Sequence, residues 1–231
     1  MKKQVVTLNI GNYEPEITKL TMPLMGMWAK KLGAELNIID TPVFNQPSVT
    51  YEKFQLYEKS RGYDWTLFVD ADTLIHPDCP DWTELVRKDT VIFNGLDLSL
   101  NRFRSNDYIR RSSNLHGACT WFVLFSDWCR DVWHPMFDGM TFEKAMENIQ
   151  STQNELCSGV CSQQHLIDDY LVTQNFCRFG LKVATVTDLL KSIGHGGEQY
   201  MFHLYAISAE QKLAELNRVI REVWKIEYLY K

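Results

Sequence analysis

The first third of the chain alternates between two hydrophobic patterns, and this alternation restricts the folds that the chain can adopt. Short apolar runs rich in strand-forming residues at positions 5–10, 34–39 and 65–69 predict strands. Between them, apolar residues recur at helical spacing over positions 16–32 and 51–60. The order strand, helix, strand, helix, strand predicts an α/β domain with a mostly parallel central sheet and helices on both faces.

The second half of the chain has a less regular pattern. It predicts two buried strands at 91–93 and 119–125, a helix at 166–175 and a short strand at 200–205. Residues 209–230 have the apolar spacing and mixed charges of an amphipathic helix that packs on the domain. Because no repeat or linker divides the 231 residues, we expect one domain.

Composition argues against several classes of protein. The 24 Lys+Arg and 29 Asp+Glu residues give a net charge of −5, which does not favour binding to nucleic acid through bulk charge. No apolar run approaches the roughly 18 residues of a membrane-spanning helix, and the stretch after Lys2 and Lys3 is too short for a signal peptide. The six cysteines form no Cys-x-x-Cys pair, so we expect reduced thiols in a cytoplasmic protein.

Two aspartates, Asp70 and Asp72, follow directly on the third predicted strand with only Ala71 between them. Alternate side chains of extended backbone share a face, so both carboxylates can reach one cation. Ligands of such sheets bind beyond the carboxyl ends of the strands. Paired carboxylates suit Mg²⁺ or Mn²⁺, which complete their coordination with water and substrate phosphate. The alternative is that the aspartates only cap the loop after a buried strand.

The surroundings of this pair resemble a known family. Residues 51–75, YEKFQLYEKSRGYDWTLFVDADTLI, are similar to the donor-site segment of GT-A glycosyltransferases, particularly the glycogenin and bacterial galactosyltransferase group. Lys53, the turn at 63–64 and the segment 70–74 match that family's lysine, Tyr-Asp turn and Asp-Ala-Asp-Thr-Leu sequence. Residues 5–39 are similar to its first strand, nucleotide loop and first helix.

This resemblance implies a GT-A (Rossmann-like) fold and a metal-dependent transfer of sugar from a nucleotide diphosphate donor, most simply a UDP-sugar, to an acceptor hydroxyl. It implies that residues 1–95 bind the nucleotide sugar and 96–208 the acceptor, with residues 209–231 as the C-terminal helix. The implied cofactor-binding residues, with Tyr13 stacked on the base and Lys53 at the donor, are Thr7, Asn9, Tyr13, Lys53, Asp70, Ala71, Asp72, His195 and Gly196.

The resemblance also implies a third metal ligand and a catalytic carboxylate. Beside Asp70 and Asp72, the metal ligand is His203, with His195 as the alternative, because the family's closing histidine motif is altered here. Residues 164–173 resemble the family's acidic helix start, where Asp168 and Asp169 occupy the catalytic positions. One would act as a general base or as a carboxylate opposite the anomeric carbon, and the other would cap the helix.

The acceptor and the stereochemistry stay open in the sequence. The glycogenin-like segments imply retention, whereas an aspartate acting as base implies inversion. The acceptor is a saccharide, a protein or a modified nucleobase. Four arginines could bind an anionic acceptor, namely Arg102, Arg104, Arg110 and Arg111. The alternative is that they belong to a solvated loop.

Two other functions remain as alternatives. The sequence FVDADTL also satisfies the nucleophile motif of haloacid-dehalogenase-like phosphohydrolases, with Asp70 as nucleophile, although that nucleophile normally ends the first strand and Asp70 ends the third. The altered histidine motif is compatible with a non-catalytic sugar-nucleotide-binding module.

Overall fold

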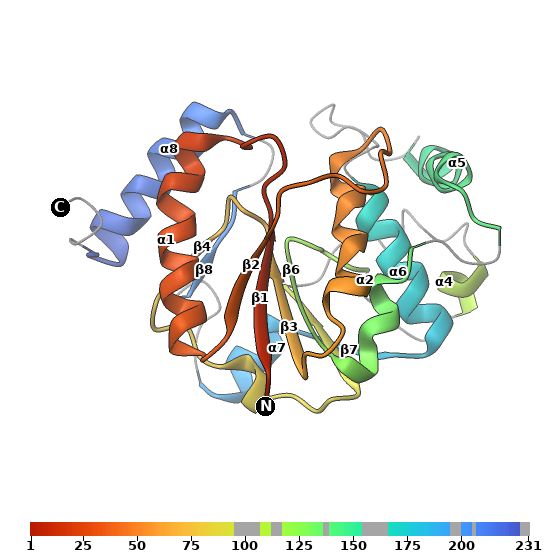
Figure 1. The fold of residues 1–231 in the computed structure, drawn as a ribbon, viewed down its shortest axis with the longest axis horizontal. Helices are drawn as coiled ribbons and strands as arrows, with labels where there is room; N and C mark the ends of the chain where they lie inside the picture. The colour runs from red at the N-terminus through yellow and green to blue at the C-terminus, as the bar shows by residue number, and fades with distance from the viewer. Residues whose placement is uncertain are drawn as a thin grey trace.

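The computed structural model describes residues 1–94, 107–111, 117–135, 139–153, 166–194, 200–204 and 207–226. Its centre is a six-stranded sheet of strand order β2-β1-β3-β6-β5-β7, which lies between two layers of helices (Figure 1). The strands of this sheet are β1 (Lys3–Leu8), β2 (Glu35–Ile39), β3 (Trp65–Val69), β5 (Thr90–Phe93), β6 (Phe122–Ser126) and β7 (Lys182–Thr185).

The sheet is mixed but mostly parallel. β1 runs parallel to both β2 and β3, and β5 runs parallel to β7, whereas β6 is antiparallel to its neighbours β3 and β5. Parallel neighbours require a crossover, which α1 (Pro15–Lys31) supplies between β1 and β2. The expected α/β fold with helices on both faces is therefore confirmed, with β6 reversed within it.

Both faces of the sheet are packed, because successive strand residues point to opposite sides. On one face, Val5 and Leu67 pack in the same buried cluster as Trp28 of α1. On the other face, Phe68 packs in a cluster with Tyr170 of α6 (Ile167–Phe179). Burial from both sides explains why β3, WTLFV, is apolar almost throughout and buried at every position.

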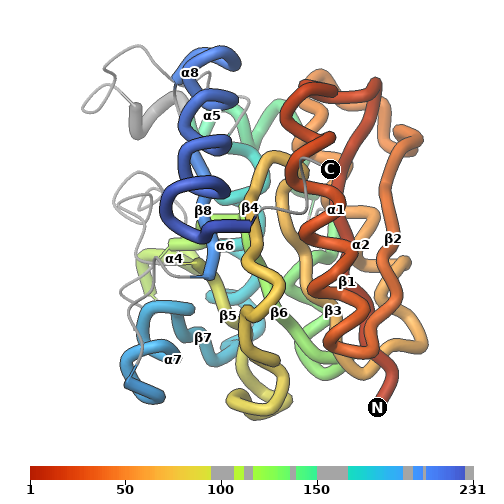
Figure 2. The backbone as a smooth tube through the Cα atoms, turned by 90° about the vertical axis from the view of Figure 1, so that its left-hand side faces the viewer, coloured from red at the N-terminus to blue at the C-terminus, as the bar shows by residue number. Residues whose placement is uncertain are grey.

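The helices form two groups around the sheet. In Figure 1, α1 and α8 (Ala209–Arg218) lie on one side, and α2 and α6 lie on the other. Figure 2 shows α8 beside α1, against which it packs through a third apolar cluster. The remaining helical segments are η1 (Val49–Gln55), α2 (Leu56–Lys59), η2 (Trp82–Glu84), α4 (Asp107–Arg111), η3 (Asp127–Trp133), α5 (Phe142–Gln153), α7 (Val186–Ser192) and η6 (Val219–Val223). None of the described helices is both long and apolar enough to cross a membrane.

Several predicted boundaries were wrong. The helix predicted at 51–60 starts as the 3-10 segment η1 and is α-helical only over α2. The last predicted helix runs as α8 and then as the π-helical turn η6, and it ends before Lys225, whose φ is 55°. That turn brings Ile226 back into the apolar cluster between α1 and α8. The last predicted strand forms only at β8 (Met201–Phe202), and positions 205 and 227–230 lie outside the described residues.

A buried glutamate fixes the loop between β2 and η1. The Glu52 side chain accepts hydrogen bonds from the backbone amides of Val43, Phe44 and Asn45 at 2.8, 2.9 and 3.1 Å, and from Gln55 Nε2 at 2.8 Å. Glu52 is only 2% exposed, so the loop is held by an interior anion. Buried amides left without such an acceptor cost free energy.

We expect Glu52→Ala to lower the free energy of unfolding by about 3 kcal/mol, because it leaves several amide donors unsatisfied. Urea denaturation of the purified protein measures this change. The matched control is Glu58→Ala, since Glu58 pairs with Arg61 on the exposed surface, where we expect little change in stability. Equal losses in the two variants would contradict the anchoring role of Glu52.

Candidate active site

Asp70, Ala71 and Asp72 form a turn at the carboxyl end of β3. The Asp70 amide donates to the carbonyl of Trp121, and the amide of Thr73 donates back to the Asp70 carbonyl at 3.0 Å. Thr21 of α1 hydrogen-bonds the Ala71 carbonyl from the other side. The turn is therefore fixed between the start of β6 and α1, and the short strand β4 (Leu74–Ile75) follows at once.

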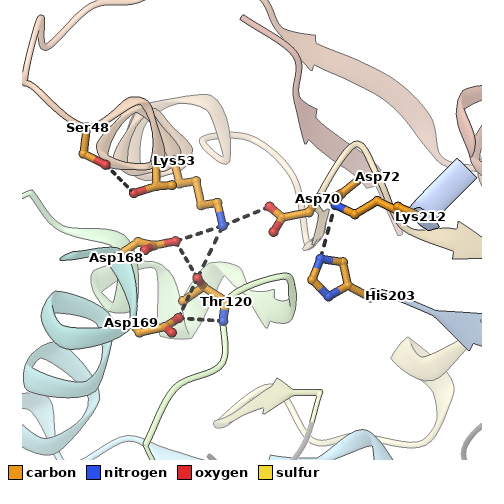
Figure 3. Close-up of polar contacts among 10 residues, drawn as sticks. Ser48, Lys53, Asp70, Asp72, Thr120, Asp168, Asp169, His203 and Lys212 are labelled. Carbon is orange, nitrogen blue, oxygen red and sulfur yellow. Dashed lines mark hydrogen bonds and ion pairs between the residues drawn. The ribbon is translucent and has the colours of Figure 1, made fainter. Parts of the chain in front are cut away.

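The pairing of β4 with β8 brings His203 to this turn. Leu74 lies opposite Phe202 in that antiparallel ladder, so the next residue after β8 faces the end of β3. One ligand atom each from Asp70, Asp72 and His203 lies within 4.8 Å of the others. Figure 3 labels the three residues. The His203 ring stacks on Trp121, with centroids 4.9 Å apart and planes 14° apart, which fixes its orientation.

These three donors fit a divalent cation. Two carboxylates and an imidazole at a strand end match the preference of Mn²⁺ for oxygen and nitrogen ligands, and the carboxylates alone also suit Mg²⁺. Asp72 is the more enclosed of the two acids, with its side chain 9% exposed against 24% for Asp70. Burial favours the protonated form of Asp72, but hydrogen bonds from His203 and Lys212 outweigh it and hold its pKa well below the usual range.

A second cluster lies beside the turn and centres on Lys53 of η1. Lys53 Nζ is 2.9 Å from Asp70 Oδ1, 2.8 Å from Asp168 Oδ2 and 3.4 Å from Thr120 Oγ1 (Figure 3). Burial would favour a neutral amine, but Asp168 and Asp70 raise the pKa of Lys53 above its ordinary value. Lys53 is therefore a charged link between the end of β3 and the start of α6.

The two aspartates at the start of α6 are joined by Thr120. Asp169 Oδ1 accepts the Thr120 amide at 2.9 Å, while the Thr120 hydroxyl oxygen lies 2.8 Å from Asp169 Oδ1 and 2.6 Å from Asp168 Oδ2. Neither aspartate caps the helix, which corrects the expected capping role: Leu166 is the N-cap, and both acids lie in the first turn, where the helix dipole favours negative charge. The Thr120 amide donates to Asp169 rather than to a neighbouring strand. The strand β6 starts at Phe122, later than predicted.

Asp168 and Asp169 differ in exposure. Asp168 is 2% exposed and is held by Lys53, whereas Asp169 is half-buried. Asp168 Oδ1 is buried and accepts no hydrogen bond from the described part of the chain. Asp168 is thus an interior ion-pair partner, and Asp169 is the more accessible carboxylate.

The loop after β1 contains Tyr13, which we expect to contact the nucleoside. Gly11, Asn12 and Glu14 have positive φ values of 70°, 54° and 39°, a strained run that only a well-determined loop maintains. Tyr13 is 45% exposed, and desolvation together with the nearby carboxylates of Asp72 and Glu14 raises the pKa of its phenol. The loop therefore lies next to the Asp72 turn.

Two further residues that we expect to bind the donor lie in β1 and the loop after it. Thr7 Oγ1 and Asn9 Oδ1 are buried, and neither has a hydrogen-bond partner among the described residues. Buried polar atoms of this kind normally have a partner.

The structure does not describe every predicted residue. His195, Gly196, Arg102 and Arg104 lie outside the described residues. On α4, Arg110 and Arg111 lie 2.7 and 3.8 Å from the carboxylate of Asp107, so both arginines have an anionic partner on their own helix.

Sequence reasoning missed three residues of the site. Thr120 had no signal in the sequence, because a threonine in an apolar run is ordinary. Lys212 had one: it is four residues before Leu216, on the buried face of the amphipathic helix, where a lysine needs a partner. Glu14 belongs to the predicted nucleotide loop, but its contact with Lys212 joins residues far apart in the sequence.

Comparisons with known proteins support the fold. No protein-family model matches the chain, and no curated protein matches it in sequence. A solved glycosyltransferase involved in the glycosylation of the major capsid of PBCV-1 superposes with a TM-score of 0.52 at 10% identity, covering 95% of this chain and 100% of that one. The galactosyltransferase LgtC, solved with donor and acceptor sugar analogues, gives a TM-score of 0.49 at 12% identity, covering 92% and 94%.

The chain therefore has the fold of the GT-A glycosyltransferases, as expected from the sequence. Within this fold it carries an Asp-Asp-His group at the carboxyl end of β3 that could hold a metal ion.

We expect Lys53→Met to destabilise the protein by about 3 kcal/mol or more at pH 7, because it leaves Asp70 and Asp168 without their shared cation. Burial raises the pKa of Asp70 even beside Lys53, and loss of this ammonium raises it further. The penalty is therefore full at high pH and shrinks as the pH falls and Asp70 binds a proton. Urea denaturation at pH 5 and pH 7 measures the difference.

The control for this prediction is Lys59→Met on the exposed surface of α2. We expect it to change stability little at either pH. A penalty of Lys53→Met that stays constant between the two pH values would contradict the ion-pair assignment.

Proposed function

We propose that the protein is a metal-dependent glycosyltransferase, which moves a sugar from a nucleotide diphosphate donor, a UDP-sugar, to an acceptor hydroxyl. The observation that carries the proposal is the group of Asp70, Asp72 and His203 at the carboxyl end of β3 in a GT-A fold. Mn²⁺ or Mg²⁺ held by these residues would supply Lewis-acid stabilisation of the departing diphosphate. Such sheets bind ligands at this edge.

The loop after β1 is proposed to bind the nucleoside. Tyr13 is exposed beside the Asp72 turn, where its ring can stack on a base. Thr7 Oγ1 and Asn9 Oδ1 supply polar groups that have no described partner within the chain. We assign residues 1–95 to the nucleotide sugar and residues 96–208 to the acceptor, and α8 of the C-terminal segment packs on α1.

Lys53 is proposed to act as a positioning residue. Its ammonium lies between Asp70 and Asp168 and is 5% exposed, so it sets the orientation of a metal ligand and of the acidic pair at once. This geometry supports a role through Asp70 more than a direct contact of Lys53 with phosphate. The Ala71 carbonyl accepts a hydrogen bond from the Thr21 hydroxyl, which holds the backbone between the two aspartates in place.

Asp169 is proposed as the carboxylate that acts at the reacting carbon or on the acceptor hydroxyl. Asp168 is occupied by Lys53, whereas Asp169 is the more exposed of the pair and is fixed by the amide of Thr120. A carboxylate held in this way keeps its position while a substrate approaches. Asp168 then positions Thr120 and Lys53 without touching the substrate.

We expect one nucleotide sugar to stabilise the protein against heat only when Mn²⁺ is present, and the nucleoside diphosphate to be released when an acceptor is supplied. A thermal-shift panel of sugar nucleotides, with and without Mn²⁺, measures the first effect. Asp72→Ala should abolish both, whereas Asp78→Ala, at a side chain 78% exposed, should change neither.

The same panel separates the proposed function from its alternatives. If no sugar nucleotide changes the thermal stability and phosphate is released from a phosphomonoester, the result would instead support a phosphohydrolase with Asp70 as nucleophile. Donor binding without any turnover across saccharide, protein and nucleobase acceptors would support a binding module.

We expect Asp169→Asn to lower kcat by about 10²-fold or more while the donor affinity stays within about twofold, because a positioned carboxylate contributes on that scale. Asp168→Asn should instead lower the thermal stability together with kcat, since it removes a buried partner of Lys53. Single-turnover kinetics and donor titration measure the two effects. An Asp169→Asn enzyme with unchanged kcat would refute the assignment.

A further inference from the structure

Lys212 is a buried cation that no step of the proposed transfer uses. It lies on α8, 140 residues after Asp72 in the sequence, and its Nζ is 2.6 Å from Asp72 Oδ2. The exposed fractions of the two side chains are 8% and 9%. Burying an ammonium and a carboxylate is costly unless they pair, so α8 contributes a charge directly to the candidate metal site (Figure 3).

A second carboxylate lies within reach of the same ammonium. Glu14 Oε2 is 3.8 Å from Lys212 Nζ, and this oxygen is buried without a hydrogen bond from any described residue. Glu14 is held in a left-handed conformation at φ 39° and ψ 66°, in the position before α1. Lys212 therefore lies between an acid that it already pairs with and an acid that still has an open acceptor.

We propose that Lys212 is a cation built into the fold, which shares Asp72 with the divalent ion and moves from Asp72 toward Glu14 when that ion binds. This inference rests on the metal site of the proposed function. A divalent charge at Asp72 weakens the attraction of that carboxylate for the ammonium and repels it. Glu14 Oε2 then accepts the displaced ammonium of Lys212, so that the ammonium stays paired with a carboxylate throughout.

This movement of the Lys212 ammonium couples the metal site to the nucleotide loop. Glu14 follows Tyr13 directly, so an ammonium drawn to Glu14 holds the loop of Tyr13 against α8. Ion binding at Asp72 and ordering of the nucleoside-binding loop thus favour one another, and such coupling is reciprocal between the two ligands. Lys212 is a positioning residue in this scheme, and its effect is measurable with the ion alone.

The test is calorimetric titration with Mn²⁺ in the absence of nucleotide. We expect Lys212→Met to bind Mn²⁺ about tenfold more tightly than the wild type, which is the scale of one hydrogen bond between charged groups. Glu14→Gln should bind it about threefold more weakly, because the ammonium loses its second acceptor. In the Lys212→Met background, Glu14→Gln should have no further effect.

A matched pair on α1 supplies the controls. Lys19 and Glu16 form an exposed ion pair, with exposed fractions of 68% and 66%, and Lys19→Met and Glu16→Gln should leave Mn²⁺ affinity unchanged. Lys212→Arg keeps the charge and should stay within about twofold of the wild type. Circular dichroism establishes that each variant is folded. Where Lys212→Met does not fold, an unchanged Mn²⁺ affinity of Glu14→Gln still overturns the inference.

The outcomes separate this inference from the proposed function. Equal Mn²⁺ affinities of the wild type and Lys212→Met overturn the inference and leave the proposed function intact. The inference is also overturned, and the proposed function left intact, if Glu14→Gln still weakens Mn²⁺ binding in the Lys212→Met background. That result would show direct attraction of the ion by Glu14. No Mn²⁺ binding by any variant overturns the metal site and both proposals together.

Discussion

The ion pairs of Lys53 with Asp70 and Asp168 are the interaction on which the geometry of the site depends. A lysine ammonium with its side chain 5% exposed requires compensating charge. Its partners come from the end of β3 and the first turn of α6, so η1, the sheet edge and α6 have to meet at one point. Thr120 joins the same cluster through its amide and hydroxyl and lies just before β6, which starts at Phe122.

Long-range packing completes the site from the other end of the chain. β8 pairs with β4 and delivers His203, and α8 packs on α1 and delivers Lys212. Neither element belongs to the six-stranded sheet, since β4 and β8 make a separate ladder. The candidate metal site therefore depends on C-terminal elements that pack beside this sheet without contributing a strand to it.

Much of this arrangement was predictable from local pattern, and the rest was not. Burial on both faces makes β3 apolar at nearly every position, so its bounds and the position of Asp70 and Asp72 followed from the sequence. The distinct roles of Asp168 and Asp169 depend on which one reaches Lys53, and a helix start alone does not show that. Lys212 is recognised as a site residue only through a contact across 140 positions. Local periodicity determines elements, whereas charge pairing between distant elements determines the site.

The balance of charge explains why the site calls for a further cation. Among the described residues, the contacts around β3 join Glu14, Asp70, Asp72, Asp168 and Asp169 with two lysines, so the carboxylates outnumber the ammonium groups. A diphosphate brought to this edge would add more negative charge in a poorly solvated place, where repulsion is strong. A divalent ion held by Asp70, Asp72 and His203 would offset that excess. Lys212 carries part of the same compensation before the ion arrives, which is why we expect the two cations to compete for Asp72.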